Sequence, residues 1–262
     1  MTARSLRERW RNGDTTLGGW LSTPSVVMAE ATARAGFDYV CIDTQHGAIE
    51  YSDTVGLIQA VLLGGASPIV RVPWNEPGII GKMLDAGAHG VIVPMVNTVE
   101  EAEAVVRACR YAPAGARSYG PSVAGLRAGD YPAWATDHVA VIPMIETRQA
   151  VESIDQILAV TGIDAIYVGP ADLSLTLGLP PGNNDDDPAF TDAFTSIIDA
   201  CARAGVVAGC HANGALAPKR TDAGFRMVTV ATDLIAARLG FRLELERARA
   251  DVTATEAGEN LY

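Results

Sequence analysis

The sequence predicts an α/β fold, a single (β/α)8 TIM barrel in which parallel strands close into a cylinder inside a ring of helices. Three observations support this fold. The chain has 262 residues, a length that suits one barrel of this kind. Eight short apolar runs occur along it, and helix-like segments separate most of them. Its 26 Gly and 6% aromatic residues fit many short strands and tight connections better than a β-sandwich.

The predicted strands are short, apolar and rich in β-branched residues, as buried parallel strands are. They cover residues 17–21, 39–43, 68–72, 90–94, 140–146, 165–169, 206–210 and 227–231. Apolar residues at helical spacing predict helices that include residues 25–36, 77–87, 98–110, 148–160 and 188–205. Several of these segments end at Gly, which often terminates a helix. We interpret the recurring Ala-Gly before a strand as this local geometry rather than as a sequence repeat.

Two polar segments interrupt the alternation of strands and helices. The longest irregular one covers residues 111–137 and is rich in Pro, Gly, Arg and Tyr, a composition and length found in lids and interfaces. The second, PPGNNDDDPAF at 180–190, predicts a helix start with Asp187 as the cap and Pro188 in the first turn. We expect its acidic residues to be solvated rather than to bind a metal.

Composition restricts the partners of this protein. A formal net charge of −11 opposes binding to nucleic acid. No signal peptide and no apolar stretch of membrane-spanning length occurs, so we expect a cytoplasmic protein without membrane partners. The four cysteines form no CxxC motif and are expected to be buried thiols. Residues 257–262 are interpreted as the remnant of a C-terminal expression tag, which leaves a single barrel domain over residues 1–256.

Two acidic residues stand where apolar runs end. Glu146 closes AVIPMIE, and Asp172 follows AIYV in the segment YVGPADLS. Because the carboxyl ends of barrel strands meet at one face, these carboxylates can share a divalent cation such as Mg²⁺ or Mn²⁺. Taken singly, Asp172 fits a helix cap and Glu146 a salt bridge. Taken with the other polar residues at strand ends, the pair favours a metal site.

Other strand ends carry groups that suit substrate binding. Arg71 follows a buried strand, where its guanidinium needs a carboxylate partner from either protein or substrate; its position favours substrate. The Gly169–Pro170–Ala171 turn enters a helix and presents backbone N–H groups that can hold a carboxylate or a phosphate. The second strand ends at Asp43, which is followed closely by Gln45.

Two histidines are candidates for proton transfer. His46 lies three residues after Asp43, whose carboxylate can orient the imidazole as a base. His211, after the seventh strand, is the competing candidate, whereas His89 and His138 precede strands and should lie at the opposite end of the barrel. A serine or cysteine nucleophile is disfavoured, since no GxSxG occurs and Cys210 has only His211 beside it. No Lys ends a predicted strand, which argues against a Schiff base.

These motifs together resemble the HpcH/HpaI family of class II, pyruvate-dependent aldolases. The resemblance runs from about Gly18 to Arg238, and it is carried by six motifs in order: GFDYVCIDTQHG, IVRVPWN, KMLDAGAHGVIVPMV, RYAPAGARSYG, IETRQAV and YVGPADLS. It implies a barrel that assembles into a homohexamer of dimers, in which the last helix is exchanged between subunits. It also implies dependence on Mg²⁺, Mn²⁺ or Co²⁺ and the cleavage of 4-hydroxy-2-oxo acids into an aldehyde and pyruvate or hydroxypyruvate.

The resemblance assigns roles to particular residues. Glu146 and Asp172 would be the metal ligands, Arg71 would bind the keto acid and stabilise enolate charge, and His46, oriented by Asp43, would transfer protons. The Gly169–Pro170–Ala171 backbone would hold the pyruvate carboxylate. Asp85 matches an acid that can approach the site of a neighbouring subunit.

The chain also departs from the family pattern. Many relatives have Glu at Gln45, and some have Gln at Met144. We expect Gln45 to contact substrate and to alter the hydrogen bonding of His46. We expect Cys210 and His211 to shape the aldehyde pocket, where some relatives have apolar residues. Two alternatives stay open. Oxaloacetate decarboxylation would use the same enolate, and a non-catalytic, pyruvate-binding barrel would lack an effective base because Gln45 stands in place of Glu.

Overall fold

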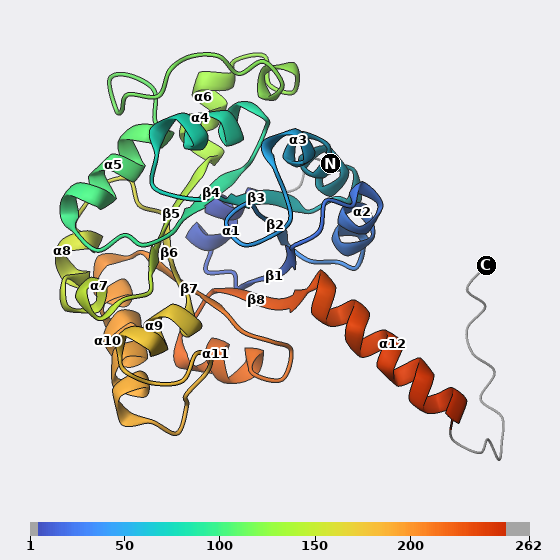
Figure 1. The fold of residues 1–262 in the computed structure, drawn as a ribbon. Coiled ribbons are helices and arrows are strands. Elements are labelled where there is room, and N and C mark those ends of the chain that lie inside the picture. Colours follow the sequence, from blue (N-terminus) through green and yellow to red (C-terminus); the bar gives the residue numbers. More distant parts are fainter. Residues whose placement is uncertain (1–4, 250–262) are drawn as a thin grey trace.

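The computed structural model describes residues 5–249 and shows a closed barrel of parallel strands surrounded by helices (Figure 1). Each strand hydrogen-bonds to the next along the chain, and β8 pairs with β1 to close the cylinder. The predicted fold is confirmed. The strands are β1 (Thr16–Leu21), β2 (Tyr39–Asp43), β3 (Ser67–Arg71), β4 (Gly90–Val93), β5 (Ala140–Ile145), β6 (Ala165–Val168), β7 (Val207–His211) and β8 (Met227–Thr232).

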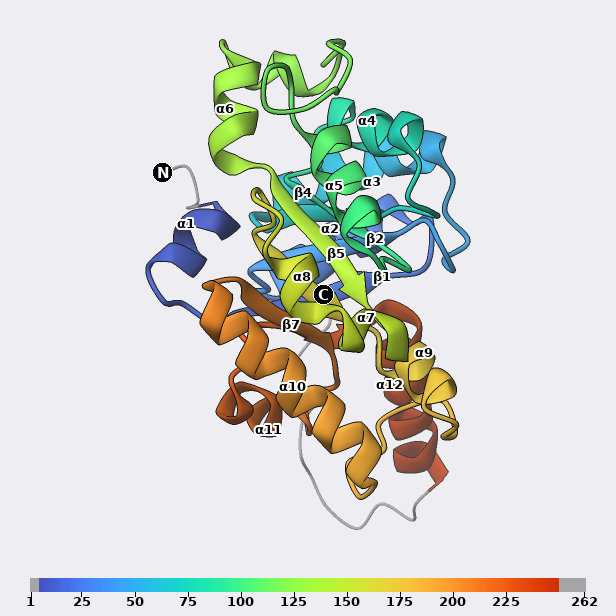
Figure 2. The same ribbon diagram turned by 90° about the vertical axis from the view of Figure 1, so that its left-hand side faces the viewer.

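Helices follow the strands and cover the outside of the barrel (Figures 1 and 2). The predicted helix over 148–160 is broken at Ser153 into two short helices. Asp187 caps its helix by accepting the Ala189 N–H, and Pro188 occupies the first position, as expected. The helices are α1 (Leu6–Arg11), α2 (Val26–Arg34), α3 (Tyr51–Gly64), α4 (Pro77–Asp85), α5 (Val99–Cys109), η1 (Ala124–Leu126), α6 (Tyr131–His138), α7 (Arg148–Glu152), α8 (Ile154–Leu158), α9 (Pro170–Thr176), α10 (Pro188–Ala204), α11 (Ala217–Ala223) and α12 (Asp233–Arg249).

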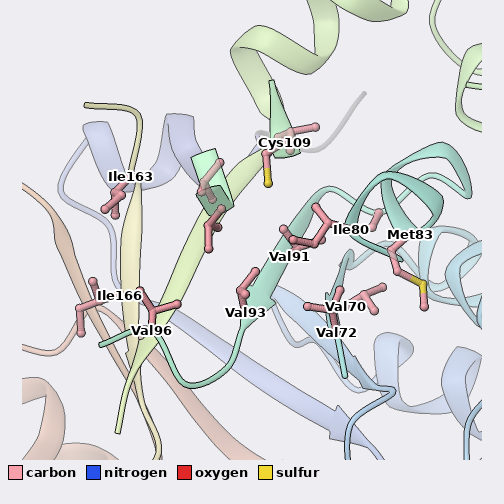
Figure 3. Packing of buried hydrophobic residues seen from close by; sticks show 14 of the residues in the cluster. Val70, Val72, Ile80, Met83, Val91, Val93, Val96, Cys109, Ile163 and Ile166 are labelled. Atoms are coloured by element: carbon pink, nitrogen blue, oxygen red, sulfur yellow. The ribbon is translucent and has the colours of Figure 1, made fainter. Parts of the chain in front are cut away.

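The strands are buried on both faces, and alternate side chains enter two separate cores. Outward-facing residues pack against the helices, as Val91 does beside Ile80 and Val70 beside Met83 (Figure 3). Inward-facing residues form a second cluster that fills the barrel and is closed at its N-terminal end by α1. Its members are Leu6, Trp10, Trp20, Tyr39, Cys41, Ile69, Ile92, Ala140, Ile142, Met144, Ala165, Tyr167, Val207 and Met227.

Aromatic residues fill the centre of the barrel because small residues make room for them. The ring of Tyr39 is fully buried and lies where a side chain at Gly18 would be. A Cβ atom built on Gly18 would come within 2.0 Å of the Tyr39 Cζ atom. The phenol oxygen of Tyr39 lies 2.9 Å from Thr229 Oγ1, so the ring is held at both ends.

The irregular segment 111–137 lies at the N-terminal end of the barrel (Figure 2). It contains η1 and most of α6, and Arg7 of α1 donates to the Thr136 carbonyl at 2.5 Å. His89 and His138 each lie 5.1 Å from the Trp134 ring, which confirms their predicted place away from the C-terminal strand ends. In a (β/α)8 barrel, every connection from a helix to the following strand lies at the N-terminal end of the strands. The segment therefore does not cover the mouth of its own barrel.

Helix α12 projects away from the barrel (Figure 1). Asp233 anchors its start by accepting the backbone N–H groups of Ser22 and Thr23 at 3.0 Å each. Beyond this anchor the helix exposes apolar side chains: Leu234, Ile235, Leu239, Phe241, Leu243 and Leu245. Within residues 5–249, no helix has the length and apolar character needed to cross a membrane. The proposed tag remnant at 257–262 lies outside the described residues.

Candidate active site

Strand alternation explains why five predicted site residues meet at the C-terminal mouth of the barrel. Each stands two positions after an inward-facing strand position and therefore shares its direction. The inward positions are Cys41, Ile69, Met144, Tyr167 and Gly209, and the residues two positions later are Asp43, Arg71, Glu146, Gly169 and His211. The predicted gathering of polar groups at this end is thus built into the register of the strands.

Asp43 and Arg71 form a buried, two-point ion pair across β2 and β3. The Arg71 Nε atom lies 2.8 Å from Asp43 Oδ1, and Nη2 lies 2.5 Å from Oδ2. Trp20 donates its indole N–H to Asp43 Oδ2 at 3.2 Å, and the Arg71 Cζ atom lies 4.8 Å above the Trp20 ring. Burial alone would raise the pKa of Asp43, but the hydrogen bonds and charge of Arg71 outweigh it and hold this pKa below its usual range.

Arg71 keeps one nitrogen available for substrate. Its Nη1 atom makes no hydrogen bond with residues 5–249. This atom is also not fully shielded from solvent. Asp43 is therefore the protein partner of Arg71, and a substrate partner for Nη1 stays a prediction. Asp43 orients the guanidinium, and the free edge can receive an anionic oxygen.

His46 lies exposed in the loop that follows β2. Asp43 Oδ1 accepts the backbone N–H of Gln45 at 3.0 Å and that of His46 at 3.3 Å. No hydrogen bond within the described part of the chain joins Asp43 to the His46 imidazole. This corrects the expectation that Asp43 orients the ring: it shapes the loop instead. Gly47 permits the tight turn, because a Cβ atom there would lie 2.3 Å from the Asp43 carbonyl oxygen.

Glu146 follows β5 directly and is almost fully buried. Its Oε1 atom accepts the backbone N–H of Met95 at 2.7 Å, and Met95 adopts a positive φ of 55°. Its Oε2 atom lies against Gly169, where an added Cβ atom would approach to 2.5 Å. Burial raises the pKa of Glu146 to about 7; the Met95 N–H and Arg71 oppose this rise, whereas the charge of Asp172 adds to it.

Asp172 supplies the second carboxylate from the first turn of α9. Glu146 Oε2 lies against Gly169, the residue that caps the start of α9 three positions before Asp172, and the charge of Asp172 raises the pKa of Glu146. The two Asp172 oxygens and Glu146 Oε2 accept no hydrogen bond from residues 5–249. None of them is fully shielded from solvent. Carboxylate oxygens are hard ligands, and these three have no hydrogen-bond donor among the described residues, so they fit Mg²⁺ or Mn²⁺. Among the described residues no cluster of three or more metal-binding side chains occurs, so water and substrate would complete the coordination.

His211 continues the inward face of β7 and stands beside Trp20 and Tyr167. Its ring meets the Trp20 ring edge-on at 5.1 Å, and its Nδ1 atom lies 3.3 Å from the Tyr167 hydroxyl. Burial lowers the pKa of His211 to about 4; the charge of Arg71 lowers it further and that of Asp43 opposes. This low pKa leaves the imidazole of His211 uncharged at neutral pH, but it also makes the ring a weak general base.

Three other predicted residues lie elsewhere or are held differently. Cys210 belongs to the outer core and is fully buried, because alternation along β7 turns it away from His211; its predicted role in the aldehyde pocket is corrected. Gln45 is half-buried in the loop after β2, and its Oε1 atom is shielded and has no partner among the described residues. Asp85, at the end of α4, pairs with Arg117 at 2.6 Å within its own chain.

Sequence reasoning missed two residues that shape this site. Trp20 touches Asp43, Arg71, Tyr167 and His211. Its position near the end of an apolar strand, at an inward-facing place, could have predicted that it lines the site. Met95 acts through its backbone N–H, so no side-chain pattern could have pointed to it.

Comparison with known proteins places this geometry in a family context. The model of the HpcH/HpaI aldolase/citrate lyase family matches residues 16–238. The hydroxypyruvate/pyruvate aldolase of Rhizorhabdus wittichii is 40% identical over 247 residues, which cover 94% of this chain and 98% of that protein. The 4-hydroxy-2-oxo-heptane-1,7-dioate aldolase of Klebsiella pneumoniae is 35% identical over 264 residues, an alignment that covers 98% of this chain and 99% of that protein.

Solved structures agree with the fold. An HpcH/HpaI aldolase/citrate lyase family protein from Burkholderia cenocepacia superimposes with a TM-score of 0.87 at 32% identity, over 94% of this chain and 99% of that one. The citrate lyase β subunit of Mycobacterium tuberculosis, solved with oxaloacetate and magnesium, reaches a TM-score of 0.57 at 16% identity. The superposition covers 86% of this chain and 94% of the citrate lyase chain. At this low identity the similarity concerns the fold alone.

Proposed function

Since the chain belongs to the HpcH/HpaI aldolase/citrate lyase family and is an aldolase, a carbon–carbon lyase, we propose that it acts on 4-hydroxy-2-oxo acids with the strand-end residues described above. The products of cleavage would be an aldehyde and either pyruvate or hydroxypyruvate. The observation that carries this proposal is the pair of carboxylates, buried Glu146 and half-buried Asp172, near the free edge of Arg71.

Glu146 and Asp172 are the residues that would hold a divalent cation, Mg²⁺ or Mn²⁺, with Co²⁺ as a further candidate. Such a cation would act as a Lewis acid toward the keto oxygen of the substrate. Met95 and Gly169 prepare the site for it: the Met95 N–H directs one Glu146 oxygen, and the absence of a side chain at Gly169 leaves room for the other. The backbone of the Gly169–Pro170–Ala171 turn would seat the carboxylate of the keto acid.

Cleavage leaves negative charge on the keto acid as its enolate. Arg71 stabilises this charge, because its guanidinium is held by Asp43 and Trp20 with a free nitrogen at the mouth. His46 is exposed at the same end and would remove the C4 hydroxyl proton, whereas the pKa of His211, lowered by burial to about 4, disfavours it as the base. Gln45, beside His46, and Asp85 of a neighbouring subunit are further candidates for substrate contact.

Two measurements test the proposed function. The purified protein with Mg²⁺ or Mn²⁺ should exchange the methyl protons of pyruvate with solvent, and it should cleave 4-hydroxy-2-oxo acids. A chelator should abolish both, and added metal should restore them. Oxaloacetate in the same assay identifies decarboxylation as a main or a side activity. If pyruvate binds with metal but neither exchange nor cleavage occurs, the barrel is a binding protein rather than an aldolase.

We further propose that α12 packs against a second copy of the chain, as a step toward a hexamer. Its apolar side chains, among them Leu239 and Phe241, are exposed at 51% and 77%, far more than a helix on its own barrel would leave open. Replacing both by Glu should shift the protein to smaller species in sedimentation velocity. Arg242→Ala on the same helix is the control and should keep the assembly; an unchanged sedimentation coefficient in the double variant would exclude α12 from the interface.

A further inference from the structure

A chain of hydroxyl groups inside the barrel determines which nitrogen of His211 carries the proton. Tyr167 donates its hydroxyl hydrogen to Thr229 Oγ1 at 2.6 Å. With that hydrogen used, the Tyr167 oxygen can only accept from His211 Nδ1, which lies 3.3 Å away. Thr229 contacts Tyr39 in turn at 2.9 Å. The neutral imidazole therefore carries its proton on Nδ1, and Nε2 is an acceptor.

The acceptor nitrogen of His211 has no donor in the part of the chain that the structure describes. Nε2 makes no hydrogen bond with residues 5–249, and it is not fully shielded from solvent. Arg71 and Asp43 are close enough to act electrostatically on the imidazole, so this nitrogen shares the mouth with the residues that would bind the keto acid. Trp20 packs edge-on against the ring and limits its rotation.

We propose that His211 Nε2 accepts a hydrogen bond from a hydroxyl group of the substrate and thereby makes the enzyme prefer hydroxylated substrates. The inference rests on the proposed aldolase function and specifies its substrate class. Three other polar groups at the mouth have different roles in the proposed reaction: Arg71 can only donate, and Glu146 and Asp172 would face the metal. A neutral acceptor that stays unprotonated at neutral pH suits an O–H donor and gives no attraction to a second carboxylate.

Two sources of such a hydroxyl are distinguishable by substrate pairs. One is the 3-hydroxyl of hydroxypyruvate, tested against pyruvate with a constant aldehyde. The other is the hydroxyl of glycolaldehyde, tested against acetaldehyde with pyruvate as the constant partner. His211→Phe keeps a ring against Trp20 and removes the acceptor, so the ratio of kcat/KM for the hydroxylated over the deoxy substrate should fall about tenfold in one of the pairs. His211→Gln, whose amide oxygen restores an acceptor, should recover part of the ratio.

Variants along the hydroxyl chain separate positioning from packing. Tyr167→Phe frees the His211 tautomer and should lower the same ratio, whereas Tyr39→Phe removes a hydroxyl one step farther away and should leave it unchanged. NMR of isotope-labelled histidine should show an unprotonated Nε2 on His211 in the wild type and a mixture of tautomers in Tyr167→Phe.

The outcomes distinguish this inference from the proposed function. An unchanged ratio in both substrate pairs for an active His211→Phe variant overturns the role of His211 alone. Equal effects of Tyr167→Phe and Tyr39→Phe overturn the argument from the tautomer. A wild-type protein that neither exchanges pyruvate protons nor cleaves any oxo acid overturns both.

Discussion

Glu146→Gln is expected to lower kcat of the metal-supplemented enzyme about a thousandfold, the loss of roughly 4 kcal/mol of transition-state stabilisation. The substitution keeps the shape of the side chain, and its amide oxygen can still accept the Met95 N–H that now binds Glu146 at 2.7 Å. It removes the charge that makes this position a strong ligand for a hard cation. Mn²⁺ affinity, measured by electron paramagnetic resonance, should fall with activity, while circular dichroism stays that of the wild type.

Asp155→Asn provides the matched control for this variant. Asp155 is an exposed carboxylate that pairs with Arg203 at 2.7 Å on the outside of the barrel, so its loss should change neither Mn²⁺ affinity nor kcat. Asp172→Asn should behave like Glu146→Gln. Wild-type Mn²⁺ affinity in both site variants would remove the metal assignment even if their activity were low.

Gly18→Ala is expected to destabilise the barrel by about 3 kcal/mol, the upper range for overpacking a buried site. The new methyl group would lie 2.0 Å from Tyr39 Cζ and 2.1 Å from Cε2. The ring cannot move away easily, because it is fully buried and its hydroxyl contacts Thr229. The free energy of unfolding, measured by urea titration, reports the effect.

Gly81→Ala is the control for this substitution. Gly81 lies in α4, and a Cβ atom there meets nothing within 4 Å, so the change should be neutral or slightly stabilising through the higher helix propensity of Ala. If Gly18→Ala unfolds at the same urea concentration as the wild type, the barrel centre is more adaptable than its packing indicates.

The position of Cys210 shows where reading strand ends from the sequence fails. Its place at the end of an apolar run predicts a site residue, as it does for Glu146. Only the register of β7 reveals that its thiol faces the outer core while His211 faces the mouth. A one-residue uncertainty in where a strand begins reverses this assignment, because side chains alternate with a period of two.

Asp43 shows a second limit. Its closeness to His46 in the sequence suggested a carboxylate–imidazole pair, yet its oxygens bind Arg71, 28 residues away, and backbone N–H groups of its own loop. Arg71 is the stronger partner because a buried guanidinium needs a carboxylate, whereas an exposed imidazole can be hydrated.

The sequence by itself determined the strand–helix alternation, the barrel and the family, since local apolar periodicity and short motifs carry that information. It also determined which acids and bases stand at strand ends, Glu146 and Asp172 among them. Only the tertiary structure decided which of these side chains meet and how each is held: Glu146 by the Met95 backbone, Arg71 by Asp43 and Trp20, and His211 by Tyr167. These contacts join residues from different strands, and closing the barrel is what brings them within hydrogen-bonding distance.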